Sequence, residues 1–293
     1  MTLIVGYSPD GKNKAIIHLA AMLARSAGED VVVCSVTPAA PLPSAARVDE
    51  EYRRYAHGEA SAALDAARKI MPADIEAEYV VHDARSTSSG LLELSQERSA
   101  SMIVLGSSSA GVFGHVALGS VTSRLLYSSH VPVALAPRGF RVRGAAKVER
   151  VTAAYNGSPD QDEMVLAAAA VAARVGATLR LAAFAVRGPT PYSTSRGSEG
   201  DSPVVSEWAE AVQRDSDAAL RRVAALPEVP DTAESVVGHG RTWAEALDDV
   251  DWVDGDVLTI GSSKSGPIKL VFLGSRAAKI VRHSPVPVVV VPR

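Results

Sequence analysis

A glycine and a later Gly-Ser pair recur with the same spacing in the two halves of this chain of 293 residues. The set consists of Gly106, Gly119 and Ser120 in the first half and Gly261, Gly274 and Ser275 in the second. A glycine at a strand end lets a ligand approach the backbone, and a Gly-Ser pair that opens a helix offers N–H groups, a hydroxyl and the positive end of the helix dipole. The pattern indicates phosphate binding. The alternative is that the glycines only form turns and the serines only cap helices.

These residues belong to an internal repeat. Residues 102–138 and 257–293 match without a gap at 14 of 37 positions. The segments LIVGYSPDG near residue 3 and VTAAYNGSPD near residue 151 also match. The repeat predicts two domains, at 1–138 and 150–293, joined by a linker at 139–149. The basic residues of the linker are interpreted as solvated charges. The Gly/Pro/Ser-rich segment 188–203 is interpreted as a surface loop.

Short apolar runs alternate with longer segments of helical periodicity in both halves. Helices are expected at 14–26, 49–70, 87–99 and 118–128 of the first half. Strands are expected near 2–7, 31–36, 75–82, 102–106 and 131–136, and near 151–155, 178–186, 234–238, 257–261 and 286–291. This alternation predicts an α/β fold of two repeated doubly wound domains, each with a parallel sheet and helices on both faces. Ligands bind such sheets at the carboxyl ends of the strands, where the strand order reverses.

The ordered set of motifs resembles the universal stress protein family, and the whole chain resembles a tandem of two such domains. The family signature is G-x2-G-x9-G-S/T, after an apolar strand and before a helix and a V-P-V strand. The resemblance implies a five-stranded parallel sheet of order 3-2-1-4-5 in each domain. It also implies that the domains pair through their last strands about a pseudo-twofold axis. Nucleotide-binding members hold ATP between strands one and four.

The two copies depart from the signature to different degrees. The second glycine is Ser109 in the first copy and Lys264 in the second, and the family's aspartate at the end of strand one is replaced by Ser8 and Asn156. Arg276 follows the second Gly-Ser pair, where the first copy keeps the family's preferred residues. The nucleotide-binding residues that the resemblance implies are Ser8, Val36, Gly106, Ser109, Gly119, Ser120, Val121, Thr122, Asn156, Gly261, Gly274 and Ser275.

These departures predict unequal sites for ATP or a related adenine nucleotide. Lost carboxylates remove acceptors for the ribose and a magnesium contact. Lys264 either places its charge on a phosphate or is a solvated loop residue. Bulk in a phosphate cradle competes with the ligand, so the first domain is expected to bind nucleotide more tightly.

Other residues that could carry chemistry are interpreted as structural. Cys34, the single cysteine, is expected to be a buried small hydrophobe. His115 is expected to have a surface role rather than a ligand contact. Arg85 and Arg241 follow the third strand of each half and either reach a ligand or bond loop carbonyls. The Asp-rich stretch 248–256 is expected to be a polar connection, and no metal site is expected because no histidine has a metal-ligand spacing.

Composition narrows the functional classes. The net charge of −3 and the 5% aromatic content argue against nucleic-acid binding, and the sequence has neither a membrane span nor a secretory signal, which predicts a cytoplasmic protein. We expect a stress-response regulatory protein that binds adenine nucleotide. The alternative is a non-catalytic dimerisation or scaffold protein with degenerate sites. Slow ATP hydrolysis is the weakest hypothesis, because neither loop contains an evident general base, so no catalytic residue is expected. Pairing of the two domains within the chain is expected, and a homodimer is a further option.

Overall fold

A computed structural model describes residues 1–10, 13–39, 46–108, 112–158, 161–186, 203–261 and 274–292, without the side chains of 46–49 and 203–206. Three sequence predictions therefore lie outside the described residues. They concern Ser109, Lys264 and nearly all of the segment 188–203.

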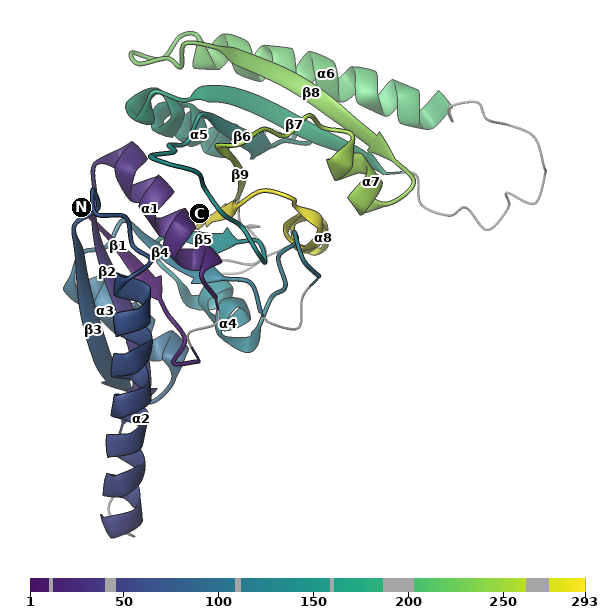
Figure 1. Cartoon of the computed structure of the whole chain (residues 1–293). Helices are drawn as coiled ribbons and strands as arrows, with labels where there is room; N and C mark the ends of the chain where they lie inside the picture. The colour runs from purple at the N-terminus through teal and green to yellow at the C-terminus, as the bar shows by residue number, and fades with distance from the viewer. Residues whose placement is uncertain are drawn as a thin grey trace, which may run out of the picture.

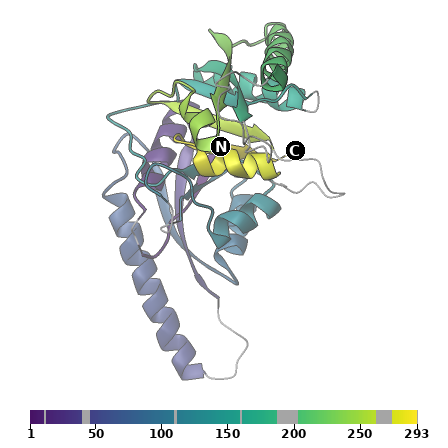
Figure 2. The same cartoon turned by 90° about the vertical axis from the view of Figure 1, so that its right-hand side faces the viewer.

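The backbone forms one ten-stranded sheet in which each half of the chain keeps its own order (Figures 1 and 2). The order is β3-β2-β1-β4-β5-β10-β9-β6-β7-β8, which is 3-2-1-4-5 in each half, as predicted. The strands of the first half are β1 (Thr2–Gly6), β2 (Asp30–Pro38), β3 (Ala77–Ala84), β4 (Met102–Gly106) and β5 (Val133–Ala136). Those of the second are β6 (Arg150–Ala154), β7 (Thr178–Val186), β8 (Ala233–Gly240), β9 (Asp256–Gly261) and β10 (Val288–Val291).

The two halves meet where β5 pairs with β10, in the one antiparallel pairing among the described strands. Val289 faces Ala134, Val288 faces Leu135 and Val290 faces Val133. In the repeat Val289 is the copy of Ala134, so the register is symmetric about that pair. The prediction that the last strands lie together is confirmed. The pairing covers two apolar strands that would otherwise be exposed edges prone to aggregation.

Both joining strands begin two residues later than predicted, at Val133 and Val288. A serine explains the delay in each half. The Ser129 hydroxyl donates to the carbonyl of Val131 and accepts from its N–H, and Ser284 makes the same two bonds to Val286. A residue whose backbone groups are bonded to a side chain does not enter the ladder.

Helices cover both faces of the sheet, as expected for parallel strands whose side chains are buried on both sides. The helices of the first half are α1 (Ala15–Ala27), α2 (Ala46–Arg68), α3 (Thr87–Glu97) and α4 (Ser120–Ser128). Those of the second are α5 (Asp162–Val175), α6 (Pro203–Val223), α7 (Trp243–Asp248) and α8 (Ser275–His283). One core cluster contains residues of α1, α2, α5 and α6 and the other contains residues of α3, α4, α7 and α8, so each core spans both halves.

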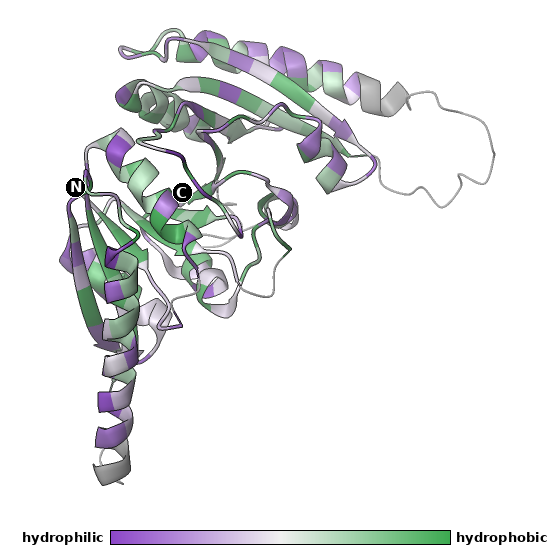
Figure 3. Cartoon of the chain, in the orientation of Figure 1, coloured by the Kyte–Doolittle hydropathy of each residue, from purple (hydrophilic) through white to green (hydrophobic). Residues whose placement is uncertain are grey.

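Hydropathy follows this layering. Apolar residues concentrate on the strands, whereas α2 and α6 alternate hydrophilic and hydrophobic residues along their length (Figure 3). In Figure 1, α2 extends well beyond the sheet, and its outer turns carry the exposed Tyr52 and Tyr55. No helix in the described parts of the chain is long and apolar enough to cross a membrane.

The segment between the halves is tied to the first half. Arg25 of α1 donates to the carbonyl of Ala146 at 2.7 Å, and the Ser26 hydroxyl accepts from the N–H of Val148 at 2.8 Å. Phe140 and Val142 pack against the core. The linker is therefore an ordered part of the fold, although its arginines are exposed as the sequence indicated.

Candidate functional site

A cleft of about 800 Å³ opens in the first half at the carboxyl ends of β1, β2 and β4. Strands β1 and β4 are neighbours in the sheet although α1, β2, α2, β3 and α3 lie between them in the chain. The helices that follow these two strands leave the sheet in different directions, which opens a crevice at the strand ends. The strand order alone therefore places a cleft where the predicted residues gather.

Seven of the predicted nucleotide-binding residues line this cleft. They are Ser8, Val36, Gly106, Gly119, Ser120, Val121 and Thr122. Ser8 and Thr122 are far apart in the sequence. The parallel pairing of β1 with β4, in which Val5 lies beside Val104, brings them to the same cleft.

The N-terminus of α4 faces the cleft. Gly119 occupies the N-cap position without a side-chain hydrogen bond, and Ser120 is the first helical residue. The interpretation that Ser120 merely caps the helix is therefore wrong, and Ser275 likewise follows an N-cap glycine, Gly274. Within the described residues no acceptor pairs with the N–H groups of Ser120, Val121 and Thr122. Such first-turn N–H groups and the helix dipole favour an anion.

Gly106 has a packing role that the sequence did not reveal. A Cβ at this position would overlap the side-chain amide of Asn13, which donates to the carbonyl of Ser107 at 2.9 Å. Ser107 in turn accepts from the N–H of Ala117 at 2.7 Å. Gly106 therefore makes room for a hydrogen bond that orders the start of the loop, in addition to leaving the strand end open.

Sequence reasoning missed the charged residues of the cleft. Lys14, Arg138 and Arg141 line it, and so does Asp10. Lys14 precedes α1, whereas the two arginines come from the end of the first half and the linker. Only the fold brings the linker back over the cleft, although the basic character of RGFRVRG was visible in the sequence. Ser8 occupies the position where the resemblance implies an aspartate. Asp10, two residues later, also lines the cleft and supplies a carboxylate there.

The end of the first half also forms backbone hydrogen bonds with the loop that leads to α4. The N–H of Gly114 donates to the carbonyl of Arg138 at 2.9 Å, and the N–H of Arg138 donates to the carbonyl of His115 at 3.0 Å. Gly139 has φ +81°, and a Cβ there would overlap the ring of Phe113. A glycine is required at this point for both reasons. The cleft wall and the interdomain segment are thus one hydrogen-bonded unit.

A second cleft, of about 350 Å³, occupies the corresponding place in the second half, at the carboxyl ends of β6, β7 and β9. Asn156 and Gly261 line it, but Gly274 and Ser275 do not; the next two residues of α8, Arg276 and Ala277, do. The structure therefore brings together the predicted site of the first half more completely than that of the second.

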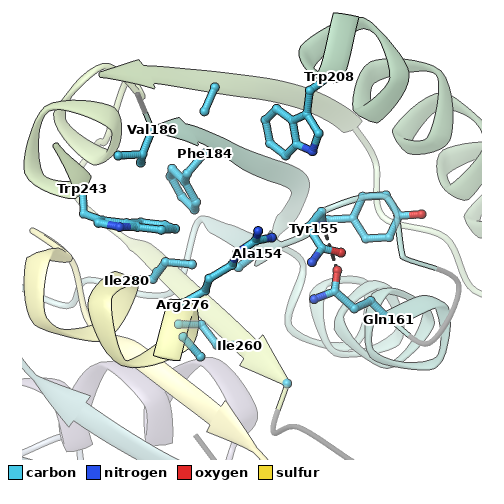
Figure 4. Close-up of a pocket in the computed structure, with 14 residues that line it drawn as sticks. Ala154, Tyr155, Gln161, Phe184, Val186, Trp208, Trp243, Ile260, Arg276 and Ile280 are labelled. Carbon is cyan, nitrogen blue, oxygen red and sulfur yellow. Dashed lines mark hydrogen bonds between the residues drawn. The ribbon is translucent and has the colours of Figure 1, made fainter. Parts of the chain in front are cut away.

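Aromatic side chains line much of this second cleft (Figure 4). Trp208 comes from α6, Trp243 from α7 and Phe184 from β7. Two of the three tryptophans lie in helical segments of the second half, which is the signal that the sequence offered. Because they are far apart along the chain, the sequence did not indicate that they line one cleft.

The remaining sequence candidates lie outside both clefts. His115 is not a simple surface residue, because its buried Nδ1 has no hydrogen-bond partner among the described residues. Its ring lies 6.4 Å from that of His283, in an edge-to-face contact between the halves. Burial and the neighbouring His115 hold the pKa of His283 below its usual value. Arg85 and Arg241 line neither cleft. Cys34 is fully buried, and burial raises the pKa of its thiol to about 12.

The Asp-rich stretch 248–256 forms a connection from α7 to β9, as expected, but its last residue is buried. Asp256 receives two hydrogen bonds of 2.7 Å from Arg150 and lies 3.4 Å from Arg180, at the end of the sheet opposite the cleft. Arg180 also donates to the carbonyl of Asp251 and lies 4.8 Å from the ring centroid of Trp252. This cluster fastens the connection to the strands.

The repeated 3-2-1-4-5 sheets, each with a cleft at its switch point, define a tandem doubly wound α/β protein. Residues 1–137 and 147–292 each match the universal stress protein family. A universal stress protein of Mycobacterium tuberculosis is 38% identical over 296 residues, with all of both chains covered. The chain therefore belongs to the universal stress protein family.

Solved structures show the same fold. A universal stress protein from Archaeoglobus fulgidus has a TM-score of 0.61 at 19% identity, covering 99% of this chain and 97% of its own. A putative universal stress protein from Pseudomonas aeruginosa has a TM-score of 0.56 at 13% identity, covering 99% and 93%.

Proposed function

We propose that this protein is a stress-response regulator that binds ATP or a related adenine nucleotide in the first-half cleft. One observation carries the proposal: the predicted cradle residues line a single cleft together with the N-terminus of α4 and the cations Lys14, Arg138 and Arg141. Backbone N–H groups and positive charges around one space match a polyphosphate.

The cleft also contains groups suited to the rest of a nucleotide. Asp10 and Ser8 offer oxygen atoms to a ribose or to a magnesium ion bound with the phosphates. Val36 and Leu91 add apolar surface against which a base could lie. The proposal is one of binding, without a catalytic residue.

The position of the linker supports a regulatory role. Arg138 and Arg141 lie on the segment between the halves, and Arg138 is bonded to the loop that leads to α4. We propose that bound phosphate pairs with these cations and thereby stabilises one arrangement of the linker and of the loop that leads to α4. The second half would report occupancy of the first.

The test is calorimetry with ATP, ADP and AMP on the intact chain, together with mass spectrometry of nucleotide that copurifies with it. Gly119→Trp places a large side chain in the first cleft and is expected to abolish binding. The matched variant Gly274→Trp, at the equivalent N-cap of the second half, is expected to retain it. If Gly274→Trp abolishes binding while Gly119→Trp leaves it intact, the ranking of the clefts is wrong.

The second candidate function is a non-catalytic scaffold with degenerate sites. The pairing of the halves through β5 and β10 favours it, because the chain's own strands form that interface. Absence of heat with any of the three nucleotides at millimolar concentration would favour the scaffold and contradict nucleotide binding.

A further inference from the structure

The second cleft has a lining of a different chemical kind from the first. Two of the chain's three tryptophans, Trp208 and Trp243, line it together with Phe184. Figure 4 shows the Phe184 ring between the two indoles, with the Arg276 side chain extending toward Ala154 on the floor of the cleft. The cleft, at about 350 Å³, is large enough for a small ring system and smaller than the first.

Two of the three rings replace smaller residues of the first cleft. The N–H of Tyr7 donates to the carbonyl of Cys34, and that of Tyr155 donates to the carbonyl of Ala182, so the strands of the two halves correspond at an offset of 148. Phe184 therefore stands in the place of Val36. Trp243 follows the N-cap of α7 as Thr87 follows the N-cap of α3. These aromatic faces provide stacking surface for a planar ligand.

The polar side chains of the second cleft are oriented as donors. The Oε1 of Gln161 accepts the backbone N–H of Asn156 at 2.9 Å, and the Oδ1 of Asn156 accepts the N–H of Ser158 at 3.0 Å. An N–H can pair only with the carbonyl oxygen of an amide side chain, so these bonds fix which end of each amide is the oxygen, and the other end is an NH2 donor.

Arg276 supplies the positive charge. It replaces Val121 of the first cleft, and none of the residues that the structure describes forms an ion pair or hydrogen bond with its guanidinium. None of the described residues that line this cleft is acidic. A guanidinium beside an aromatic space is suited to a carboxylate, which it binds through two parallel hydrogen bonds.

We infer that the second-half cleft binds a small planar aromatic carboxylate, with its ring among Trp208, Phe184 and Trp243 and its carboxylate on Arg276. Among the described residues, one cation lines this cleft and three line the first, a lining that suits a single carboxylate better than a polyphosphate. The inference is independent of nucleotide binding in the first cleft.

The test uses 2-naphthoate as the probe and the full chain with Gly119→Trp, which blocks the first cleft. Calorimetry and tryptophan fluorescence are both expected to report binding, because the ring lies against Trp208 and Trp243. The neutral isostere 2-naphthalenemethanol is expected to bind about tenfold more weakly, since it lacks the charge that Arg276 pairs with.

Arg276→Gln is expected to reduce the affinity for 2-naphthoate by about tenfold and to leave that for the neutral alcohol unchanged. Arg276 is exposed, so the variant is expected to fold. The matched control Arg282→Gln removes the same charge from the last turn of α8, outside the cleft, and is expected to bind like the parent. Trp243→Thr, which restores the first-half residue type, is expected to weaken both probes.

Three results would overturn the inference. They are no binding of 2-naphthoate at millimolar concentration, equal loss in the Arg276→Gln and Arg282→Gln variants, and tighter binding of AMP than of 2-naphthoate in the Gly119→Trp chain. The last result would make the second cleft another nucleotide site.

Discussion

The two clefts occupy equivalent places in equivalent sheets, yet their linings differ. Among the described residues, the first cleft combines glycines, hydroxyls and three cations, whereas the second combines aromatic rings with one guanidinium. Three replacements account for much of the difference: Val36 by Phe184, Thr87 by Trp243 and Val121 by Arg276. The backbone determines where a ligand can bind, and a few side chains at the strand ends and first helical turns determine which ligand it can be.

The halves also differ at the end of the sheet opposite the clefts. A substitution there is expected to have the largest effect of those predicted here, on the free energy of unfolding. The positions of Arg150, Arg180 and Asp256 correspond to Thr2, Val32 and Ser101, so the first half has no ions at the equivalent described positions. We expect Asp256→Ala to lower the free energy of unfolding by about 3–5 kcal/mol, because it leaves two arginines without their buried partner.

Urea unfolding followed by circular dichroism measures this effect. The matched change Ser101→Ala in the first half is expected to cost about 1 kcal/mol, since it removes only hydrogen bonds of a hydroxyl. Equal losses in the two variants would contradict the assignment of the cluster as the main fastening of the α7–β9 connection.

Introducing the aromatic residues of the second cleft into the first tests whether these side chains determine which ligand each cleft binds. We expect the double variant Val36→Phe and Thr87→Trp to weaken ATP binding by at least about tenfold, because the rings occupy space needed by the ligand. Calorimetry measures the change. The reverse pair, Phe184→Val and Trp243→Thr, is expected to leave ATP binding unchanged. A comparable loss in the reverse pair would mean that ATP binds in the second half.

The contribution of the linker to the first cleft predicts a smaller effect. Arg141→Gln is expected to weaken ATP binding by about two- to fivefold, and less at high salt, because the side chain is exposed. Arg143 lies two residues further along the linker and does not line the cleft, so Arg143→Gln is the matched control. If both variants bind ATP like the parent, the linker takes no part in the site.

His18 in the first half and His283 in the second have lowered pKa values, so we expect stability to depend modestly on pH. Burial, and then Arg141 and Lys14, lower the pKa of His18, while burial, and then His115 and Arg282, lower that of His283. The unfolded chain therefore binds more protons than the folded one below about pH 6.5, and stability is lost as the pH falls through that range.

The measurement is urea unfolding at pH 7.5 and 5.5. The decrease is expected to be smaller in His283→Gln than in the parent and unchanged in His130→Gln, which alters an exposed histidine. A full-sized decrease in His283→Gln would exclude the contact between the halves as a cause.

The residues of the candidate site and of the contact between the halves differed in how far they could be predicted. Gly119 and Ser120 were predicted from a local motif, a strand followed by a loop and a helix start, and Thr122 was implied by the resemblance to the family. Arg141 was interpreted as a solvated charge, since nothing local relates it to Ser8. His115 was expected at the surface, and its contact with His283 depends on how the two halves pack.

Local pattern was sufficient for the fold class and the repeat, because periodicity and repeat spacing are properties of neighbouring residues, and parallel strands with right-handed crossovers allow few topologies. The strand order 3-2-1-4-5 and the pairing of the last strands were implied by the resemblance to the family. The lining of each cleft depended on the tertiary structure. Trp208, Trp243 and Phe184 come from three separate elements, and their convergence follows from the packing of α6 in one core cluster and α7 in the other. The chemistry of a site built from distant segments is determined by that packing, which residue spacing does not encode.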